Sequence, residues 1–145
     1  MRDLYRTHTP TISLRPEAAL TLSELQRRGH PLGLITDGRI VTQRLKIEAL
    51  KLGRWFAPEF TLISEAIGRS KSSGEPFRIM ERRMSGLAHN FIYVGDNPAK
   101  DIEWPAKLGW TTVLIADNGS HIHPQPPCAA SSLKIQTLHE LLDIC

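Results

Sequence analysis

The stretch Phe91-Ile-Tyr-Val-Gly-Asp-Asn-Pro-Ala-Lys-Asp101 points to both the fold and the chemistry of this chain. Its apolar beginning predicts a short buried strand, which Gly95 brings to a turn. Two carboxylates, Asp96 and Asp101, follow the strand. Carboxylate oxygens, together with water and substrate phosphate, are the ligands that Mg²⁺ prefers. The stretch therefore predicts a metal site at the carboxyl end of a strand, although Asp96 or Asn97 could instead act only as a helix cap.

Apolar strand patterns alternate with amphipathic helix patterns on both sides of this stretch. The order predicts an α/β domain with a parallel, Rossmann-like sheet between two layers of helices. The polar segments 64–74 and 118–132 are predicted to be loops. The predicted strands are 32–36, 60–63, 91–94 and 111–115, and the predicted helices are 16–28, 40–52, 75–84, 98–108 and 137–144. The side chains of helix 40–52 that should face the core are Val41, Leu45, Ile47, Leu50 and Leu52.

The composition is that of a globular domain with a mild excess of positive charge. Apolar residues make up 41% of the 145 residues and the formal net charge is +3, with a pI of about 9.1. No aromatic residues interleave with the basic ones, which argues against a nucleic-acid partner. The basic side chains suit a solvated helix face, or a small phosphorylated or anionic ligand. Part of the excess lies at Arg69, Lys71, Arg78, Arg82 and Arg83.

The two cysteines, Cys128 and Cys145, do not form a disulfide framework, and we interpret both as free thiols in a reducing compartment. No apolar run approaches the roughly 20 residues that cross a bilayer. The first residues lack the apolar region of a signal peptide. We therefore expect a cytoplasmic protein without a membrane partner.

A second strand end offers groups that could bind phosphate. In open parallel sheets, ligands bind beyond the carboxyl ends of the strands. Thr36 ends the strand 32–36, and the turn at Asp37 and Gly38 would present backbone N–H groups beside its hydroxyl. This set could cradle a phosphoryl oxygen, or Thr36 could simply cap a helix after an ordinary turn. Lys71, in the loop 64–74, could neutralise a phosphate or could be a solvated lysine.

Three motifs together resemble the haloacid dehalogenase (HAD)-like hydrolase superfamily. They are Thr36 in Leu-Ile-Thr-Asp-Gly, Lys71 before Glu-Pro-Phe, and the loop Gly-Asp-Asn-Pro-Ala-Lys-Asp that ends at Asp101. The resemblance extends over about residues 4–143, and it implies the C-terminal part of a HAD-like core domain. Residues 1–15 would be an irregular lead-in, and neither the N-terminal nucleophile motif nor a cap domain is recognisable within residues 1–145.

The resemblance implies Mg²⁺-dependent hydrolysis of phosphomonoesters. Family phosphatases use an aspartate at the end of a first strand as a nucleophile, which forms an aspartyl-phosphate. Thr36 and Lys71 would be catalytic and would bind phosphate together with Asp37 and Gly38. Asp96 would ligate Mg²⁺, and Asp101 would position the metal or its waters.

Two departures from the family pattern limit this expectation. Ser72 follows Lys71 where many members have proline, and no Asp-x-Asp follows an apolar run before Thr36. Asp3 is a poor match, because the family's second aspartate, two residues after the nucleophile, acts as acid and base, and Tyr5 at that position cannot. We therefore assign no nucleophile. We expect the chain alone to hydrolyse phosphomonoesters weakly or not at all. The alternative is a non-catalytic binding or assembly module. A phosphate-acceptor regulatory domain fits less well, because its acidic pair should lie near the first strand.

The absent first strand would lie between the strands 32–36 and 91–94 in the family's sheet. Three arrangements are physically possible. The two flanking strands could pair with each other, the segment 11–14 could replace the strand, or another chain could complete the sheet. That chain could be a second copy, as in a homodimer, or a missing N-terminal polypeptide. We favour direct pairing or dimerisation, because the remaining elements keep consistent core patterns.

Overall fold

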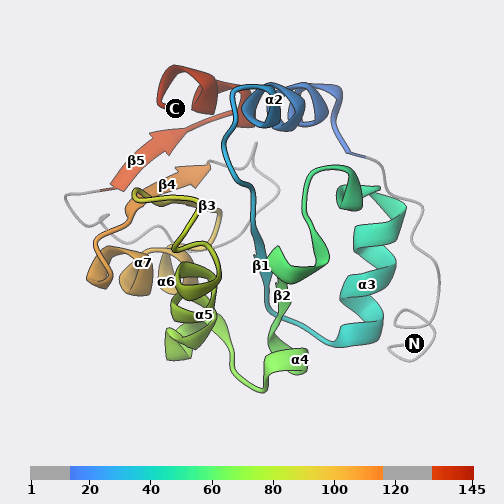
Figure 1. Ribbon diagram of the computed structural model, residues 1–145, viewed down its shortest axis with the longest axis vertical. Helices are drawn as coiled ribbons and strands as arrows, with labels where there is room; N and C mark the ends of the chain where they lie inside the picture. The colour runs from blue at the N-terminus through green and yellow to red at the C-terminus, as the bar shows by residue number, and fades with distance from the viewer. Residues whose placement is uncertain (1–13, 116–131) are drawn as a thin grey trace.

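The computed structural model describes residues 14–115 and 132–145, and it contains short parallel strands flanked by helices (Figure 1). No helix within these two ranges is long and apolar enough to cross a membrane. In chain order, the elements are α2 (Pro16–Arg27), β1 (Leu34–Thr36), α3 (Ile40–Ala49), η1 (Leu52–Arg54), η2 (Pro58–Phe60), β2 (Thr61–Ile63), α4 (Ser64–Ile67), η3 (Lys71–Ser73), α5 (Glu75–Arg83), β3 (Ile92–Gly95), α6 (Pro98–Asp101), α7 (Glu103–Lys107), β4 (Thr111–Ile115), β5 (Ser132–Ile135) and η4 (Leu138–Asp143).

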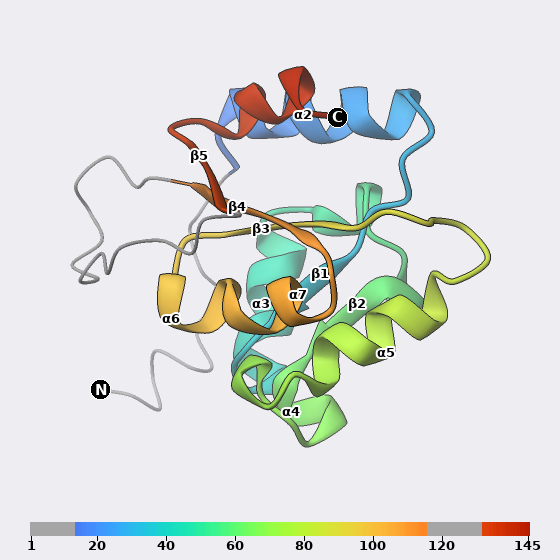
Figure 2. The ribbon, with the colours of Figure 1, turned by 90° about the vertical axis from the view of Figure 1, so that its left-hand side faces the viewer.

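The strands form two parallel sheets rather than one. β1 pairs with β2, with Ile35 opposite Leu62. The second sheet has the order β3-β4-β5, with Val94 opposite Val113 and Leu133 also opposite Val113. Figure 2 shows β1 and β2 below β3 and β4. The helix α2 and the red C-terminal helix η4 lie above β3 and β4, and α5 to α7 lie below them. The predicted α/β class with helices on both faces is confirmed.

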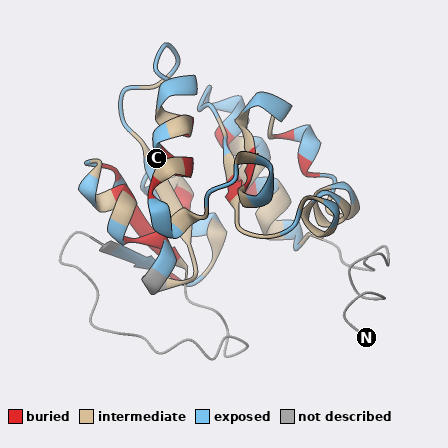
Figure 3. Cartoon of the chain, turned by 90° about the horizontal axis from the view of Figure 1, so that it is seen from below, coloured by how far each residue is buried: buried red, intermediate tan, exposed pale blue. Residues whose placement is uncertain are grey.

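Two apolar clusters fill the two sides of these sheets. The first, which we call the Phe77 cluster, joins both sheets to α5 through Ile35, Leu62, Phe77, Met80, Met84 and Trp110. The second, which we call the Val113 cluster, joins β4 and β5 to α2 and η4 through Leu25, Val113, Ile135 and Leu141. Figure 3 shows the buried residues on the inner sides of the ribbon, with the outward turns of the helices exposed.

Most predicted elements are confirmed near their predicted positions, but four details of local structure differ from the expectation. The segment 64–74 contains α4 and η3 rather than only a loop. The helix expected over 98–108 is divided into α6 and α7, because the ring of Pro105 is incompatible with continuous helical bonding to the Asp101 carbonyl. β5 begins at Ser132, the last residue of a predicted loop, and continues over residues for which no strand was predicted. The C-terminal helix is a 3-10 helix.

The expected burial of the apolar side of α3 is also wrong. None of the residues of α3 is buried, and Val41 is 57% exposed. Leu52, beyond the end of the helix, is buried in η1. A sheet of two strands is narrow, so it gives α3 too little surface to cover its apolar side.

Direct pairing of β1 with β3, which we favoured, does not occur. Within the part of the chain that the structure describes, β1 pairs only with β2 and β3 pairs only with β4. Lys71 joins the carboxyl ends of these strands instead, through its backbone N–H to Asp37 and its ammonium group to Asp101. The segment 11–14, which could have replaced the strand, falls almost entirely outside the described residues.

Candidate active site

Thr36 and Asp37, at the end of β1, are held by Gln43 from α3. The side-chain N–H of Gln43 donates to the Thr36 hydroxyl at 2.5 Å and to the Asp37 carbonyl at 3.1 Å. Because the hydroxyl accepts this bond, its own hydrogen can still point to an oxygen of a ligand. Gly38 leaves room for Gln43, since a Cβ at that position would lie 2.9 Å from the Gln43 side chain. The turn therefore requires glycine.

The helix α4 fixes the same turn from the end of β2. The Gly38 N–H donates to the Ser64 hydroxyl at 2.8 Å, and this hydroxyl donates to the Gly38 carbonyl at 3.3 Å. The Ile40 N–H donates to the Glu65 carboxylate at 3.0 Å. These bonds lock the backbone N–H of Gly38 into the protein. The expected role of Gly38 in binding phosphate would therefore require this bond to open.

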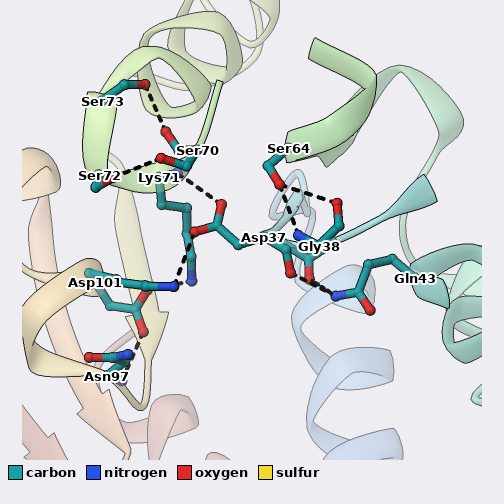
Figure 4. A network of polar contacts seen from close by, with 12 residues as sticks. Asp37, Gly38, Gln43, Ser64, Ser70, Lys71, Ser72, Ser73, Asn97 and Asp101 are labelled. Carbon is teal, nitrogen blue, oxygen red and sulfur yellow. Dashed lines mark hydrogen bonds and ion pairs between the residues drawn. The ribbon is translucent and has the colours of Figure 1, made fainter. Parts of the chain in front are cut away.

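Lys71 links the carboxyl ends of β1 and β3 (Figure 4). Its backbone N–H donates to Asp37 Oδ1 at 2.8 Å, and its ammonium group donates to Asp101 Oδ1 at 2.6 Å. The side chain of Asp101 is 1% exposed and that of Lys71 is 13% exposed. The bond is therefore charge-assisted and shielded from water, which strengthens it.

Tyr93, on β3, completes this buried group of polar side chains. Its hydroxyl donates to Asp101 Oδ1 and accepts from the Lys71 ammonium group, each at a distance of 3.4 Å. Burial raises the pKa of Tyr93 well above its usual value, and the negative charge of Asp101 raises this pKa further. The phenol is therefore neutral and acts as a hydrogen-bond group beside the ion pair.

The second oxygen of Asp101 is also occupied. Oδ2 accepts the backbone N–H of Asn97 at 2.9 Å, so the carboxylate closes the loop that follows β3. Gly95 is required beside it, because a Cβ there would clash with the Asp101 carboxyl group. Asp101 is thus held on both oxygens by the protein, as a residue that positions its neighbours.

A half-exposed lysine adds positive charge at the mouth of the site. Lys100 Nζ lies 3.7 Å from Asp37 Oδ2, and its side chain is 50% exposed. An ion pair with this exposure contributes little to stability. Lys100 nevertheless places a cation beside Asp37, where an anionic ligand would need it, while the ammonium group of Lys71 lies on Asp101.

Serine side chains hold the Lys71 loop in the place of the family's proline. The Ser73 hydroxyl donates to the Ser70 carbonyl at 2.7 Å, and the Ser70 and Ser72 hydroxyls lie 2.7 Å apart. The indole N–H of Trp104 donates to the Ser72 carbonyl at 2.9 Å. Ser72 is therefore accommodated in a single turn of 3-10 helix, and Lys71 is still directed at Asp101.

The carboxylates near this edge suit a Mg²⁺ site that is completed by water and substrate phosphate better than one formed entirely by protein side chains. Within the described ranges, no three His, Cys, Asp or Glu side chains are grouped as a metal site. Mg²⁺ needs only one or two carboxylates, since water and substrate phosphate supply its other ligands. Asp96, which follows β3 directly, can supply such a carboxylate. Asp101 suits the expected supporting role, because both of its oxygens already accept hydrogen bonds.

The structure brings most of the predicted site residues to one edge of the fold. Asp37, Lys71 and Asp101 are in direct contact, and Thr36 is joined to them through Gln43. Three positioning residues were not predicted: Gln43, Ser64 and Tyr93. Their residue types are ordinary for a helix, a loop and a strand, so only contacts across the fold reveal them. Asp3 lies outside the described residues.

Comparison with known proteins shows similarity to a family of hydrolases. Residues 7–109 match the family model described as haloacid dehalogenase-like hydrolase. The chain is 36% identical over 129 residues to a glyceraldehyde 3-phosphate phosphatase of Methanocaldococcus jannaschii, covering 89% of this chain and 55% of that protein. It is 33% identical over 128 residues to a phosphoserine phosphatase of Thermus thermophilus, covering 88% and 49%.

A solved structure shows the same fold. The HAD phosphatase from Thermococcus onnurineus superimposes with a TM-score of 0.74 at 28% sequence identity, over 90% of this chain and 57% of that one. The chain thus spans about half the length of the curated relatives that it matches.

Proposed function

Because this chain belongs to the haloacid dehalogenase-like hydrolases, we propose that its site binds a small phosphorylated molecule and serves the hydrolysis of a phosphomonoester. In that reaction, water adds its oxygen to phosphorus, and the ester oxygen leaves with a proton as an alcohol. Two of its relatives are named as phosphatases of phosphorylated small molecules. The observation that carries the proposal is the contact of Lys71 with both Asp37 and Asp101, next to the Thr36 hydroxyl.

The residues have distinct roles in this proposal. The Thr36 O–H donates to a phosphoryl oxygen, while Gln43 holds the hydroxyl in position. Lys71 offsets the charge that collects on the phosphoryl oxygens, and Asp101 orients its ammonium group. A Mg²⁺ ion would be held by Asp96 with support from Asp101, and it would neutralise phosphate charge.

Turnover by residues 1–145 alone should be slow. The aspartate nucleophile of family phosphatases has no counterpart at a strand end before Thr36. The remaining groups can bind and polarise a phosphate but cannot form an aspartyl-phosphate at the family's position. A second candidate function, that of a non-catalytic binding module, is favoured by one edge each of β1 and β3, which have no strand partner there within residues 14–115 and 132–145.

The test measures phosphate release from glyceraldehyde 3-phosphate and phosphoserine with Mg²⁺, together with the affinity for inorganic phosphate. Thr36→Val should weaken phosphate binding by about tenfold, because it removes one hydrogen bond to an anion. Thr61→Val is the matched control, since Thr61 begins β2 and donates to the Ala57 carbonyl at 2.9 Å, away from the site. Equal affinities for the two variants would refute a phosphate site at Thr36. Rapid Mg²⁺-dependent release that is lost in Asp96→Ala would refute slow turnover.

A further inference from the structure

A groove lies between α3 and β2, on the side of the two-stranded sheet that faces away from the Phe77 cluster. Leu62 packs in that cluster, so its neighbours on β2, Thr61 and Ile63, direct their side chains to the opposite face. α3 lies beside β2 (Figure 1), but it buries none of its own residues. The space between the helix and the strand has a volume of about 670 Å³, and we call it the α3–β2 groove.

Apolar side chains form much of the lining of this groove. They are Ile47, Phe56, Pro58, Ile63 and Ala66. They come from α3, from the segment between η1 and β2, from β2 itself and from α4. Pockets of about 300–1,000 Å³ with mostly apolar walls are the usual binding sites of small molecules. The groove therefore suits a small ligand with an apolar body.

Positive charge predominates among the charged side chains of the groove. Its cations are Arg44, Lys51 and Arg54, and its one carboxylate is that of Glu48. Within residues 14–115 and 132–145, neither Arg44 nor Lys51 forms an ion pair. The Arg54 guanidinium lies over the Trp55 ring, 4.2 Å from its centroid. All three cations are exposed, so they form a positively charged edge that favours an anionic group on the ligand.

The groove is separate from the candidate active site, although α3 and α4 contribute residues to both. Gln43 and Ser64 fix the turn after β1, whereas Arg44 and Ala66 line the groove. None of the side chains that contact Lys71 lines the groove. A ligand in the groove therefore does not occupy the place that we propose for phosphate.

We propose that the α3–β2 groove binds a small amphipathic anion, in which a carboxylate or sulfonate group is joined to an apolar ring. The anionic group pairs with Arg44, whose planar guanidinium can donate to two oxygens at once. Lys51 and Arg54 add to the positive potential around it. The ring packs against Ile47 and Phe56, where it leaves water. The inference does not depend on the proposed hydrolysis, since it requires no residue of the candidate active site.

The experiment titrates the full chain with naphthalene sulfonate and follows methyl groups by NMR. The methyl signals of Ile47 and Ile63 should shift and reach saturation, because both residues line the groove. The dissociation constant should be about 1 mM or lower for a ligand of this size. The methyl signals of Val113, in the other cluster, should not shift. Naphthylmethylammonium has the same ring and the opposite charge, and it should bind at least about tenfold more weakly. An excess of inorganic phosphate should not displace the sulfonate.

Three variants locate the site on the protein. Arg44→Gln removes the cation that pairs with the anionic group, and it should weaken binding of the sulfonate about threefold. Lys46→Gln is the matched control, because Lys46 carries the same charge on the same helix but does not line the groove. It should change the affinity less than about 1.5-fold, since an exposed charge away from the ligand is screened. Ala66→Trp fills the groove from an exposed position on α4 and should abolish saturable binding.

Several results would overturn the proposal. They are a dissociation constant well above about 1 mM, equal binding of the two probes, equal effects of the two charge variants, and unchanged binding in Ala66→Trp. Displacement by phosphate would also overturn it, because the sulfonate would then lie in the candidate active site. The same methyl shifts in a probe-free dimer would make a second copy the occupant of the groove. The affinity for inorganic phosphate is measured separately with Thr36→Val, so failure of this proposal and failure of the proposed function are distinguishable.

Discussion

The two halves of the molecule differ in how completely their strands are covered. In the three-stranded half, β4 lies between two partners and its residues Thr112 to Leu114 are buried. In the two-stranded half, β2 is buried at Leu62 and Ile63, but α3 buries no residue at all. The three-stranded sheet thus buries its middle strand, whereas α3, in the two-stranded half, stays partly exposed.

The halves are nevertheless joined by one core and one polar bridge. The Phe77 cluster takes Ile35 and Leu62 from the first sheet and Trp110 from the region before β4. Phe77 makes edge-to-face contacts with Tyr93 and Trp110, with ring centroids 4.9 and 5.7 Å apart. Lys71 forms the polar bridge. Four changes test how strongly the halves depend on one another.

Phe77→Ala should have the largest effect on stability. Phe77 is completely buried, and truncation should lower the free energy of unfolding by about 4 kcal/mol through lost burial and a residual cavity. Urea denaturation followed by circular dichroism measures this change. Leu87→Ala, at a residue that is 58% exposed, is the control and should cost less than about 0.5 kcal/mol. Two separate transitions in Phe77→Ala would mean that the halves unfold independently, whereas one transition supports a shared core.

Lys71→Met should have the next largest effect, about 3 kcal/mol, because it leaves the buried Asp101 carboxylate without its cation. Chemical denaturation at neutral pH gives the value. Lys100→Met removes the half-exposed lysine beside Asp37 and should cost less than about 0.5 kcal/mol. Similar losses for the two variants would show that the Lys71 bridge does not hold the halves together.

Tyr93 should make the protein less stable at high pH. Its pKa is raised in the folded state from the ordinary value of 10.0, mainly by burial. Above pH 10 the unfolded chain therefore loses this proton while the folded chain keeps it. The free energy of unfolding should fall by up to about 1.4 kcal/mol per pH unit from this group. Denaturation from pH 9 to 11 should show a smaller fall in the free energy of unfolding for Tyr93→Phe than for the unaltered protein. Equal pH dependence in the two proteins would contradict a raised pKa of Tyr93.

Arg28→Ala should have the smallest effect and should act within the three-stranded half. Arg28 Nη1 donates to the carbonyls of Leu142 and Cys145 at 3.0 Å each, so it ties α2 to the C-terminal residues. Its loss should lower the unfolding free energy by about 1 kcal/mol and speed hydrogen exchange in η4. Arg27→Ala is the control, because among the described residues the Arg27 side chain bonds Glu24 in the same helix, and it should leave η4 unchanged. Faster exchange in η4 in both variants would contradict this role.

Local sequence patterns predicted four of the five described strands. The strands β1 to β4 lie within two residues of their predicted ends, because each is a compact apolar run with a turn signal beside it. The break at Ile102, between α6 and α7, follows from Pro105, whose ring cannot continue the helical bonding. β5 was missed because Ser132-Leu-Lys-Ile135 is too short to be distinguished from a loop without its partner β4.

The sequence by itself determined the family, the α/β class and the residues that could bind phosphate or metal. Thr36, Lys71 and Asp96 are recognisable because the spacing of their motifs along the chain is distinctive. Only the tertiary structure decided that Lys71 pairs with Asp101 and that the sheet is divided between β1 and β3. Those features depend on distances between segments some 30 to 60 residues apart along the chain, and local periodicity carries no information about such distances.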